Sequence, residues 1–214
     1  MESLTRVTGI AAPMLSANID TDQIIPTRFL RRLSEEGLGE GLFAEWRVQA
    51  DGMPDPTFVL NRAPWNEATI LVAGPNFGCG SSREAAPRAM RQHGFRAVVA
   101  SSFGDIFFSN CFRCGLLPVR LPAEIVDSIG ARLQSGAIEQ LHIDLNEERL
   151  QIVGSDESHS FNTPPRLRQM LLLGLDEIEQ TLLHQTAISA FRERDRSRRP
   201  WVYRSPDASH ESAS

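Results

Sequence analysis

Short apolar runs alternate with longer amphipathic segments through the middle of this 214-residue chain. Three apolar runs have the length of buried strands, and they cover residues 69–73, 96–101 and 116–121. Each run is followed by a segment whose apolar positions recur at helical spacing, over residues 82–92, 105–114 and 123–134. This alternation predicts an α/β fold in which some of the strands pair in parallel.

Segments nearer the two ends of the chain add strands and helices to this centre. Residues 5–15 predict a strand followed by a loop, and residues 141–145 and 149–153 predict a β-hairpin. Residues 164–173 and 175–191 predict two further helices. The second of these helices has an apolar stripe, formed by Ile178, Leu182, Leu183 and Ala187.

The chain has no internal repeat and no segment with the composition of a linker. We therefore predict one domain over residues 1–202. From Arg192 onwards the sequence becomes rich in arginine, and then in serine and acidic residues. Residues 203–214 are predicted to form a disordered tail, because they offer little apolar surface to bury.

Composition narrows the class of protein. Apolar residues make up 41% and charged residues 23% of the sequence, as in an ordinary soluble protein. The formal net charge of -5 argues against nucleic acid or an anionic membrane as the partner. No apolar run approaches the length of a membrane span, and residues 1–20 lack a secretory pattern, so we expect a cytoplasmic protein. The absence of lysine excludes Schiff-base chemistry.

The segment between the first central strand and the first central helix carries the strongest functional signal. Residues 74–84 read GPNFGCGSSRE. Glycines in a strand-to-helix turn let the backbone approach a ligand closely, and the helix start offers unpaired N–H groups to an anion. The hydroxyls of Ser81 and Ser82 and the guanidinium of Arg83 lie at the same point. The segment therefore indicates chemistry on a small anionic substrate.

The spacing of this segment fits none of the common phosphate or nucleophile motifs. It lacks the Gly-Lys-Ser/Thr ending of a P-loop, the Gly-x-Gly-x-x-Gly pattern and the Gly-x-Ser-x-Gly elbow. A purely structural interpretation is that Ser81 or Ser82 caps the helix, with Glu84 in its first turn. The residues of this segment alone leave both interpretations open.

Three longer segments share a more specific pattern. They are residues 18–30 (NIDTDQIIPTRFL), 76–84 (NFGCGSSRE) and 94–107 (GFRAVVASSFGDIF). Together with residues 174–178 and 181–185 near the end, they resemble the small subunits of 3-isopropylmalate dehydratase, in the aconitase superfamily. The likeness extends in unbroken order over roughly residues 4–202.

This resemblance implies the swivelling β/β/α domain of aconitase, a mixed sheet flanked by helices, as a separate chain. It also implies a hydro-lyase subunit that isomerises 2- and 3-isopropylmalate, small dicarboxylic hydroxy acids, by dehydration and rehydration in leucine biosynthesis. The expected partner is a large subunit with a [4Fe–4S] cluster, in a heterodimer or a larger assembly. The cluster acts as a Lewis acid on the leaving hydroxyl. This chain itself is expected to bind no metal and no cofactor.

Roles for individual residues follow from the same resemblance. Ser81 is the expected general base, and Arg83 is expected to bind a substrate carboxylate. Ser82 and the N–H groups around Gly80 would stabilise the oxyanion or a second carboxylate. Arg28 is a candidate for a second carboxylate ligand. The candidates for orienting the substrate or contacting the large subunit are Asp20, Thr21 and Asp22.

The three cysteines invite a different interpretation, as ligands of a metal cluster. Cys111 and Cys114 form a C-x-x-C pair, and Cys79 is a third thiol. The pair falls within a predicted helix, however, and the family places its cluster ligands on the other subunit. A structural zinc site would require a fourth ligand. We therefore predict that Cys111 is a buried structural residue.

Ala85 departs from the family pattern, which has a histidine after Ser-Ser-Arg-Glu. This substitution leaves open a related hydro-lyase that acts on methylmalate/citraconate, dimethylmaleate or homoaconitate. A non-catalytic anion-binding module is the third interpretation. The intact Ser81, Ser82 and Arg83 argue against it, because a module freed from catalysis need not keep a serine base.

Overall fold

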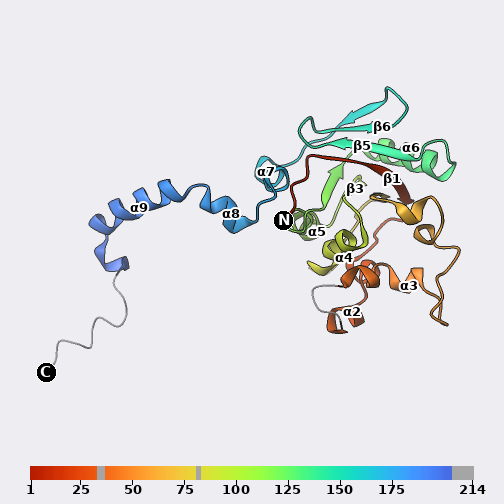
Figure 1. The fold of residues 1–214 in the computed structure, drawn as a ribbon, viewed down its shortest axis with the longest axis horizontal. Coiled ribbons are helices and arrows are strands. Elements are labelled where there is room, and N and C mark those ends of the chain that lie inside the picture. The colour runs from red at the N-terminus through yellow and green to blue at the C-terminus, as the bar shows by residue number, and fades with distance from the viewer. Residues whose placement is uncertain (33–36, 81–82, 204–214) are drawn as a thin grey trace. The chain divides into compact units, whose positions relative to one another are not determined.

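The computed structural model describes residues 1–32, 37–80 and 83–203 of the chain (Figure 1). Contacts divide the chain into two compact units, Met1–Leu175 and Asp176–Ser214. The single domain expected over residues 1–202 remains a prediction. Almost all of the expected tail, residues 204–214, lies outside the described residues.

A seven-stranded mixed sheet forms the centre of the first unit, in the order β4-β3-β2-β1-β5-β6-β7. The strands are β1 (Arg6–Met14), β2 (Ile70–Ala73), β3 (Ala97–Ala100), β4 (Leu117–Arg120), β5 (Gln140–Asp144), β6 (Arg149–Ile152) and β7 (Ser158–Ser160). Strands β1 to β4 are parallel, whereas β5, β6 and β7 continue the sheet with antiparallel pairing. The mixed α/β fold predicted from the sequence is confirmed.

Strand β1 joins the two halves of the sheet because its two ends pair on different sides. Its first half pairs antiparallel with β5, with Gly9 opposite Leu141. Its second half pairs parallel with β2, with Met14 opposite Ala73. Pro13 is tolerated because the β5 ladder has already ended at Ile10, so its missing N–H leaves no ladder bond unmade.

Helices cover both faces of the parallel part of the sheet (Figure 1). The helices of the first unit are α1 (Thr21–Ile24), α2 (Thr27–Arg32), α3 (Ala44–Arg47), α4 (Ala85–His93), α5 (Asp105–Arg113), α6 (Ala123–Gln134) and α7 (Pro165–Leu173). Short 3-10 turns are η1 (Leu38–Gly41), η2 (Val59–Asn61) and η3 (Trp65–Glu67). Helices α4 and α5 contact each other, and α6 packs across β1, β2 and β3. Every residue of β2 and β3 is buried, as expected for strands covered on both faces.

The second unit differs from the sequence prediction. The single helix predicted over residues 175–191 is wrong, because two helices occupy the region, α8 (Glu177–Leu182) and α9 (Gln185–Arg198), followed by the turn η4 (Pro200–Tyr203). Helix α8 begins with a capping box between Asp176 and Glu179. It ends where the N–H groups of Leu183 and His184 both bond to carbonyls within α8, which tightens its last turn. The predicted apolar stripe is therefore divided between two helices.

Two smaller differences concern segments without a clear hydrophobic pattern. The turn predicted at residues 18–26 contains the four-residue helix α1. Strand β7 has the sequence Ser-His-Ser and was not predicted, since it offers no apolar alternation to identify it. No helix in the described part of the chain combines the length and the apolarity needed to cross a membrane.

Candidate active site

The glycine-rich loop leaves the carboxyl end of β2 and runs beside the segment that follows β1. The N–H of Gly78 donates to the carbonyl of Ile19 over 2.7 Å, and the N–H of Thr21 donates to the carbonyl of Cys79 over 3.0 Å. The side-chain amide of Asn76 donates to Asn18 Oδ1 over 2.8 Å. Two of the three segments that carry the family resemblance therefore lie side by side.

The third segment holds the other side of the same loop. The N–H of Phe77 donates to the carbonyl of Ser102 over 3.1 Å, and the N–H of Gly104 donates to the carbonyl of Phe77 over 2.9 Å. The N–H of Asn76 is bound by the hydroxyl of Ser102 at 2.8 Å. The loop is thus fixed between two segments that lie far from it in sequence.

Glycine is required where these segments meet. Gly78 has a φ of +70°, and a Cβ atom there would lie 2.2 Å from the ring of Phe107. A Cβ on Gly104 would lie 2.5 Å from the carbonyl oxygen of Gly78. Phe107 in turn packs edge-on against Phe77, with ring centroids 5.4 Å apart. The position of the loop therefore depends on two glycines and two aromatic rings.

Arg83 is held by the start of α1 and α2. Its Nη1 atom lies 2.6 Å from Oδ1 of Asp22 and 2.9 Å from Oγ1 of Thr27. The hydroxyl of Thr27 also donates to Asp22 Oδ1 over 3.0 Å, which closes a triangle. The Arg83 side chain is only 22% exposed. One edge of the guanidinium is therefore fixed before any ligand binds.

Sequence reasoning missed Thr27. It belongs to the segment that carries the resemblance, but no role was assigned to it. The sequence feature that could have identified Thr27 was a hydroxyl five residues after Asp22, on the other side of the turn at Pro26. Only the fold shows that Thr27 and Asp22 share one atom of Arg83.

Asp20 and Thr21 lie next to Gly80. A Cβ on Gly80, whose φ is +91°, would lie 3.4 Å from Asp20 Cβ and 3.7 Å from Thr21 Oγ1. The Asp20 carboxylate caps α1 by accepting from the N–H of Gln23 over 2.8 Å. Thr21 is buried, with 2% of its surface exposed. Both residues therefore form the wall beside the loop, and Asp20 is already used as a helix cap.

Arg28 is placed apart from this group. Its guanidinium pairs with Glu45 and stacks 4.9 Å from the ring centroid of Phe29. Ser81 and Ser82, the predicted base and its neighbour, lie outside the described residues. Among the described residues, the structure places Gly80 next to Asp20 and Thr21, and Arg83 next to Asp22.

Helix α4 begins at Ala85, one turn later than a serine cap requires. Glu84 is the N-cap residue, and its side chain does not cap the helix but pairs with Arg88. Ala85 is half-buried and packs against the core. The position where the family has a histidine therefore lies at the very start of the helix that follows Arg83.

Cys111 is buried, whereas Cys79 and Cys114 are half-buried. Burial raises the pKa of Cys111 well above its ordinary value, and the nearby Cys114 adds to this effect. Burial, and then the charge of Glu84, raise the pKa of Cys114 to about 11. Among the described residues, no three His, Cys, Asp or Glu side chains gather as a metal site.

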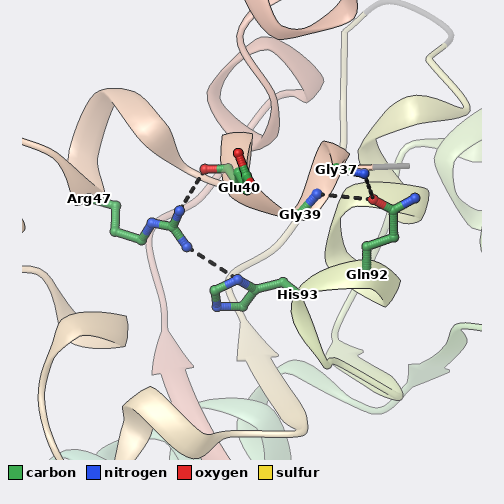
Figure 2. Close-up of a pocket in the computed structure, with 6 residues that line it drawn as sticks. All are labelled: Gly37, Gly39, Glu40, Arg47, Gln92 and His93. Carbon is green, nitrogen blue, oxygen red and sulfur yellow. Dashed lines mark hydrogen bonds between the residues drawn. The ribbon is translucent and has the colours of Figure 1, made fainter. Parts of the chain in front are cut away.

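A hollow of roughly 600 Å³ lies at the other end of α4 (Figure 2). The Gln92 side-chain oxygen accepts from the N–H groups of Gly37 and Gly39, at 3.1 and 3.2 Å. Arg47 reaches across the hollow, donating to the carbonyl of Glu40 over 2.6 Å and lying 3.2 Å from His93 Nδ1. These contacts fix η1 and α3 against the end of α4.

The chemistry of this hollow is set by the partial burial of a guanidinium and an imidazole. Burial lowers the pKa of the Arg47 guanidinium, while the Glu40 carboxylate acts in the opposite direction. Burial, and then the positive charge of Arg47, lower the pKa of His93 below its ordinary value of 6.5. The neutral imidazole is therefore the form that the folded chain favours.

Comparison with known proteins agrees with this architecture. The sequence model of the aconitase C-terminal domain matches residues 1–124. The solved structure of 3-isopropylmalate dehydratase from Methanocaldococcus jannaschii is 28% identical, with a TM-score of 0.60, and the match covers 87% of this chain and 99% of that one. The fold and the site therefore define an aconitase-type domain.

Sequence relatives narrow the family further. The 3-isopropylmalate dehydratase small subunit of Gluconobacter oxydans is 48% identical, and the match covers 94% of this chain and 96% of that protein. The small subunit of Rhodospirillum centenum is 45% identical, with 94% and 99% covered. The chain belongs to the family of 3-isopropylmalate dehydratase small subunits.

The close packing at Gly78 predicts a large loss of stability on substitution. Gly136→Ala serves as the matched control, since Gly136 has a similar φ of +75° with nothing within 4 Å of an added Cβ. We expect Gly136→Ala to cost about 1 kcal/mol from backbone strain alone. Gly78→Ala should cost roughly 1–3 kcal/mol more through overpacking against Phe107. Urea unfolding measures both, and equal losses would contradict the packing argument.

The lowered pKa of His93 predicts a pH-dependent stability. Below pH 6.5 the unfolded chain protonates this histidine while the folded chain resists, so the free energy of unfolding falls as the pH decreases. Above pH 6.5 the contribution is fully present. His93→Gln should reduce the dependence of the free energy of unfolding on pH between pH 5 and pH 6.5. The reduction should be smaller than ~1.4 kcal/mol per pH unit, which is the slope for the uptake of one full proton on unfolding. Unchanged slopes in urea unfolding, or an imidazole pKa at or above 6.5 by NMR, would contradict this.

Proposed function

We propose that this chain is the small subunit of a 3-isopropylmalate dehydratase, a hydro-lyase that interconverts 2- and 3-isopropylmalate in leucine biosynthesis. The names of its relatives support this assignment. The observation that carries it is the fixed guanidinium of Arg83 beside the glycine loop, held by Asp22 and Thr27. A substrate with two carboxylates requires such a cation at the reacting end.

Arg83 has the free donors that carboxylate binding needs. Asp22 and Thr27 occupy only Nη1. Its Nε and Nη2 atoms make no hydrogen bond to the residues that the structure describes, so one side of the planar fork is available. A carboxylate can accept from two guanidinium N–H groups at once, which fixes its orientation as well as its position. We assign Arg83 to a substrate carboxylate on this basis.

Ser81 is proposed as the general base. It would remove the proton from the carbon that lies next to a carboxylate, as the double bond forms and hydroxide leaves the neighbouring carbon. A serine accepts such a proton only as an alkoxide, which requires N–H groups and positive charge nearby. Arg83 and the backbone around Gly80 are the groups proposed for this task, and Ser82 is proposed to bind the oxyanion or the second carboxylate.

The remaining residues are assigned positioning roles. Asp22 orients Arg83, and Asp20 and Thr21 form the wall next to Gly80. Arg28 could bind the second carboxylate only by leaving Glu45. Both members of that ion pair are about half exposed, so the pair is weak enough to exchange partners.

The large subunit is the proposed site of the [4Fe–4S] cluster. The relatives are named small subunits, which implies a separate large subunit and supports this placement. The proposed assembly is a heterodimer or a larger complex in the cytoplasm. No step assigned to Ser81 or Arg83 above depends on cluster geometry.

Reconstitution tests the function directly. The chain is produced anaerobically with a large subunit, and the unsaturated intermediate is followed by its absorbance, first with isopropylmalate and then with citraconate. Activity on isopropylmalate that requires both chains is the expected result. Activity on citraconate alone would replace this proposal with the related hydro-lyase and make Ala85 a marker of specificity.

Ser81→Ala tests the base. We expect kcat to fall by roughly 10²–10⁴-fold while the complex still assembles, because general-base catalysis contributes about that factor. The control is Ser128→Ala, an exposed serine on α6, which should keep full activity. An assembled S81A complex with normal turnover would refute the assignment of the base, and an inactive wild-type complex on all these acids would favour the binding module.

Asp22→Asn tests the positioning of Arg83. The variant keeps the hydrogen bond of Thr27 but loses the charge-assisted one, so KM should rise about tenfold with a smaller change in kcat. Asp127→Asn, an exposed carboxylate on α6, is the matched control. An unchanged KM in D22N would show that Asp22 does not orient Arg83 toward the substrate.

A further inference from the structure

A second hollow, of roughly 270 Å³, lies at the end of the sheet opposite to the glycine loop. It is found at the amino ends of β2 and β3, beside the first half of β1, whereas the loop follows the carboxyl end of β2. Its lining comes from residues 2–8, Thr69, Arg91 and Arg96. No role in the proposed reaction involves any of these residues.

Two polar groups in this lining are buried without a hydrogen-bond partner. They are the Nη1 atom of Arg96 and the Oγ1 atom of Thr69. The N–H of Arg96 donates to the carbonyl of Thr69 over 2.7 Å, which keeps the two residues on adjacent strands side by side. The Thr69 hydroxyl occupies the space beside Gly9, where a Cβ atom would lie only 2.1 Å from it. Unpaired buried donors are costly, particularly on a charged group.

The charges around the hollow are unequally matched. Arg91 pairs with Glu2 at 2.9 Å, and Arg6 pairs with Asp144 at 2.6 Å. The guanidinium of Arg96 has no ion pair and no hydrogen bond to any residue in the described ranges. One half-buried cation in a polar hollow therefore lacks a counter-charge.

We infer that this hollow binds a small oxyanion through the guanidinium of Arg96, while the Thr69 hydroxyl is buried beside it. The chemistry shared by its possible ligands is a carboxylate or phosphate group, since the guanidinium fork matches either. The volume restricts the ligand to an ion or a small metabolite. The site lies away from Arg83, so its ligand is an effector or a structural ion rather than the substrate.

Calorimetric titration of the intact chain tests this inference. The probes are inorganic phosphate and succinate, with sodium chloride at the same ionic strength as the reference. We expect binding of at least one probe, and about tenfold or greater loss of affinity in Arg96→Gln, since a hydrogen bond to a charged group is removed. Affinity tags belong at the C-terminus, because Glu2 lines the hollow.

Arg83→Gln separates this site from the proposed active site. The probe that binds the hollow should keep its wild-type affinity in R83Q and lose it in R96Q. Binding lost in R83Q but kept in R96Q would overturn the inference, and so would the absence of binding beyond the chloride reference. Phosphate alone, or succinate alone, would identify which oxyanion the site prefers.

Thermal unfolding provides a second test, which does not depend on a measurable heat of binding. Thr69→Val removes an unpaired hydroxyl, so it should leave the Tm without anion nearly unchanged. Because Oγ1 is buried, Thr69→Val should also keep the gain in Tm that the bound anion gives the wild-type chain, whereas Arg96→Gln should lose it, since ligands stabilise only the state that binds them. A gain in Tm that persists in Arg96→Gln would refute the site.

Discussion

The divided pairing of β1 is the constraint on which the rest of the first unit depends. One strand supplies an antiparallel ladder to β5 with its first half and a parallel ladder to β2 with its second half. The parallel layers that carry the glycine loop and the antiparallel extension are therefore parts of one sheet. Pro13 fits this strand because it lies beyond the β5 ladder, and Gly9 fits because the Thr69 hydroxyl occupies the space that a Cβ atom would need.

The same sheet determines what lies at its two ends. At the carboxyl end of β2, backbone hydrogen bonds from two distant segments clamp the loop, and the contact of Gly78 with Phe107 leaves no space for a side chain. That clamp brings Arg83 to Asp22 and Thr27. At the amino end, the backbone bond between Arg96 and Thr69 places a guanidinium and a hydroxyl in one hollow. At the first end the guanidinium of Arg83 is held by the Asp22 carboxylate. At the other end the guanidinium of Arg96 has no counter-charge among the described residues.

Helix α4 begins next to Arg83 and ends at the hollow lined by η1, Arg47 and His93. Thr27 bonds to Arg83 just before the helix begins, and Gly39 bonds to Gln92 near its end. Residues of α2 and of η1 therefore contact the two ends of α4. The contact between His93 and Arg47 lies at the C-terminal end of α4, where partial burial keeps the imidazole neutral.

The sequence by itself determined the central strands and helices, the nature of the glycine loop and the family, because these depend on local periodicity and on contiguous motifs. It failed where the pattern was weak, as in β7, or where a local turn interrupted a helical stripe, as at Leu183 and His184. Only the tertiary structure decided that Thr27 shares Arg83 with Asp22, and that Arg28 pairs with Glu45 instead. These contacts join residues separated by tens of positions, and their geometry is fixed by sheet pairing and packing that no local pattern encodes.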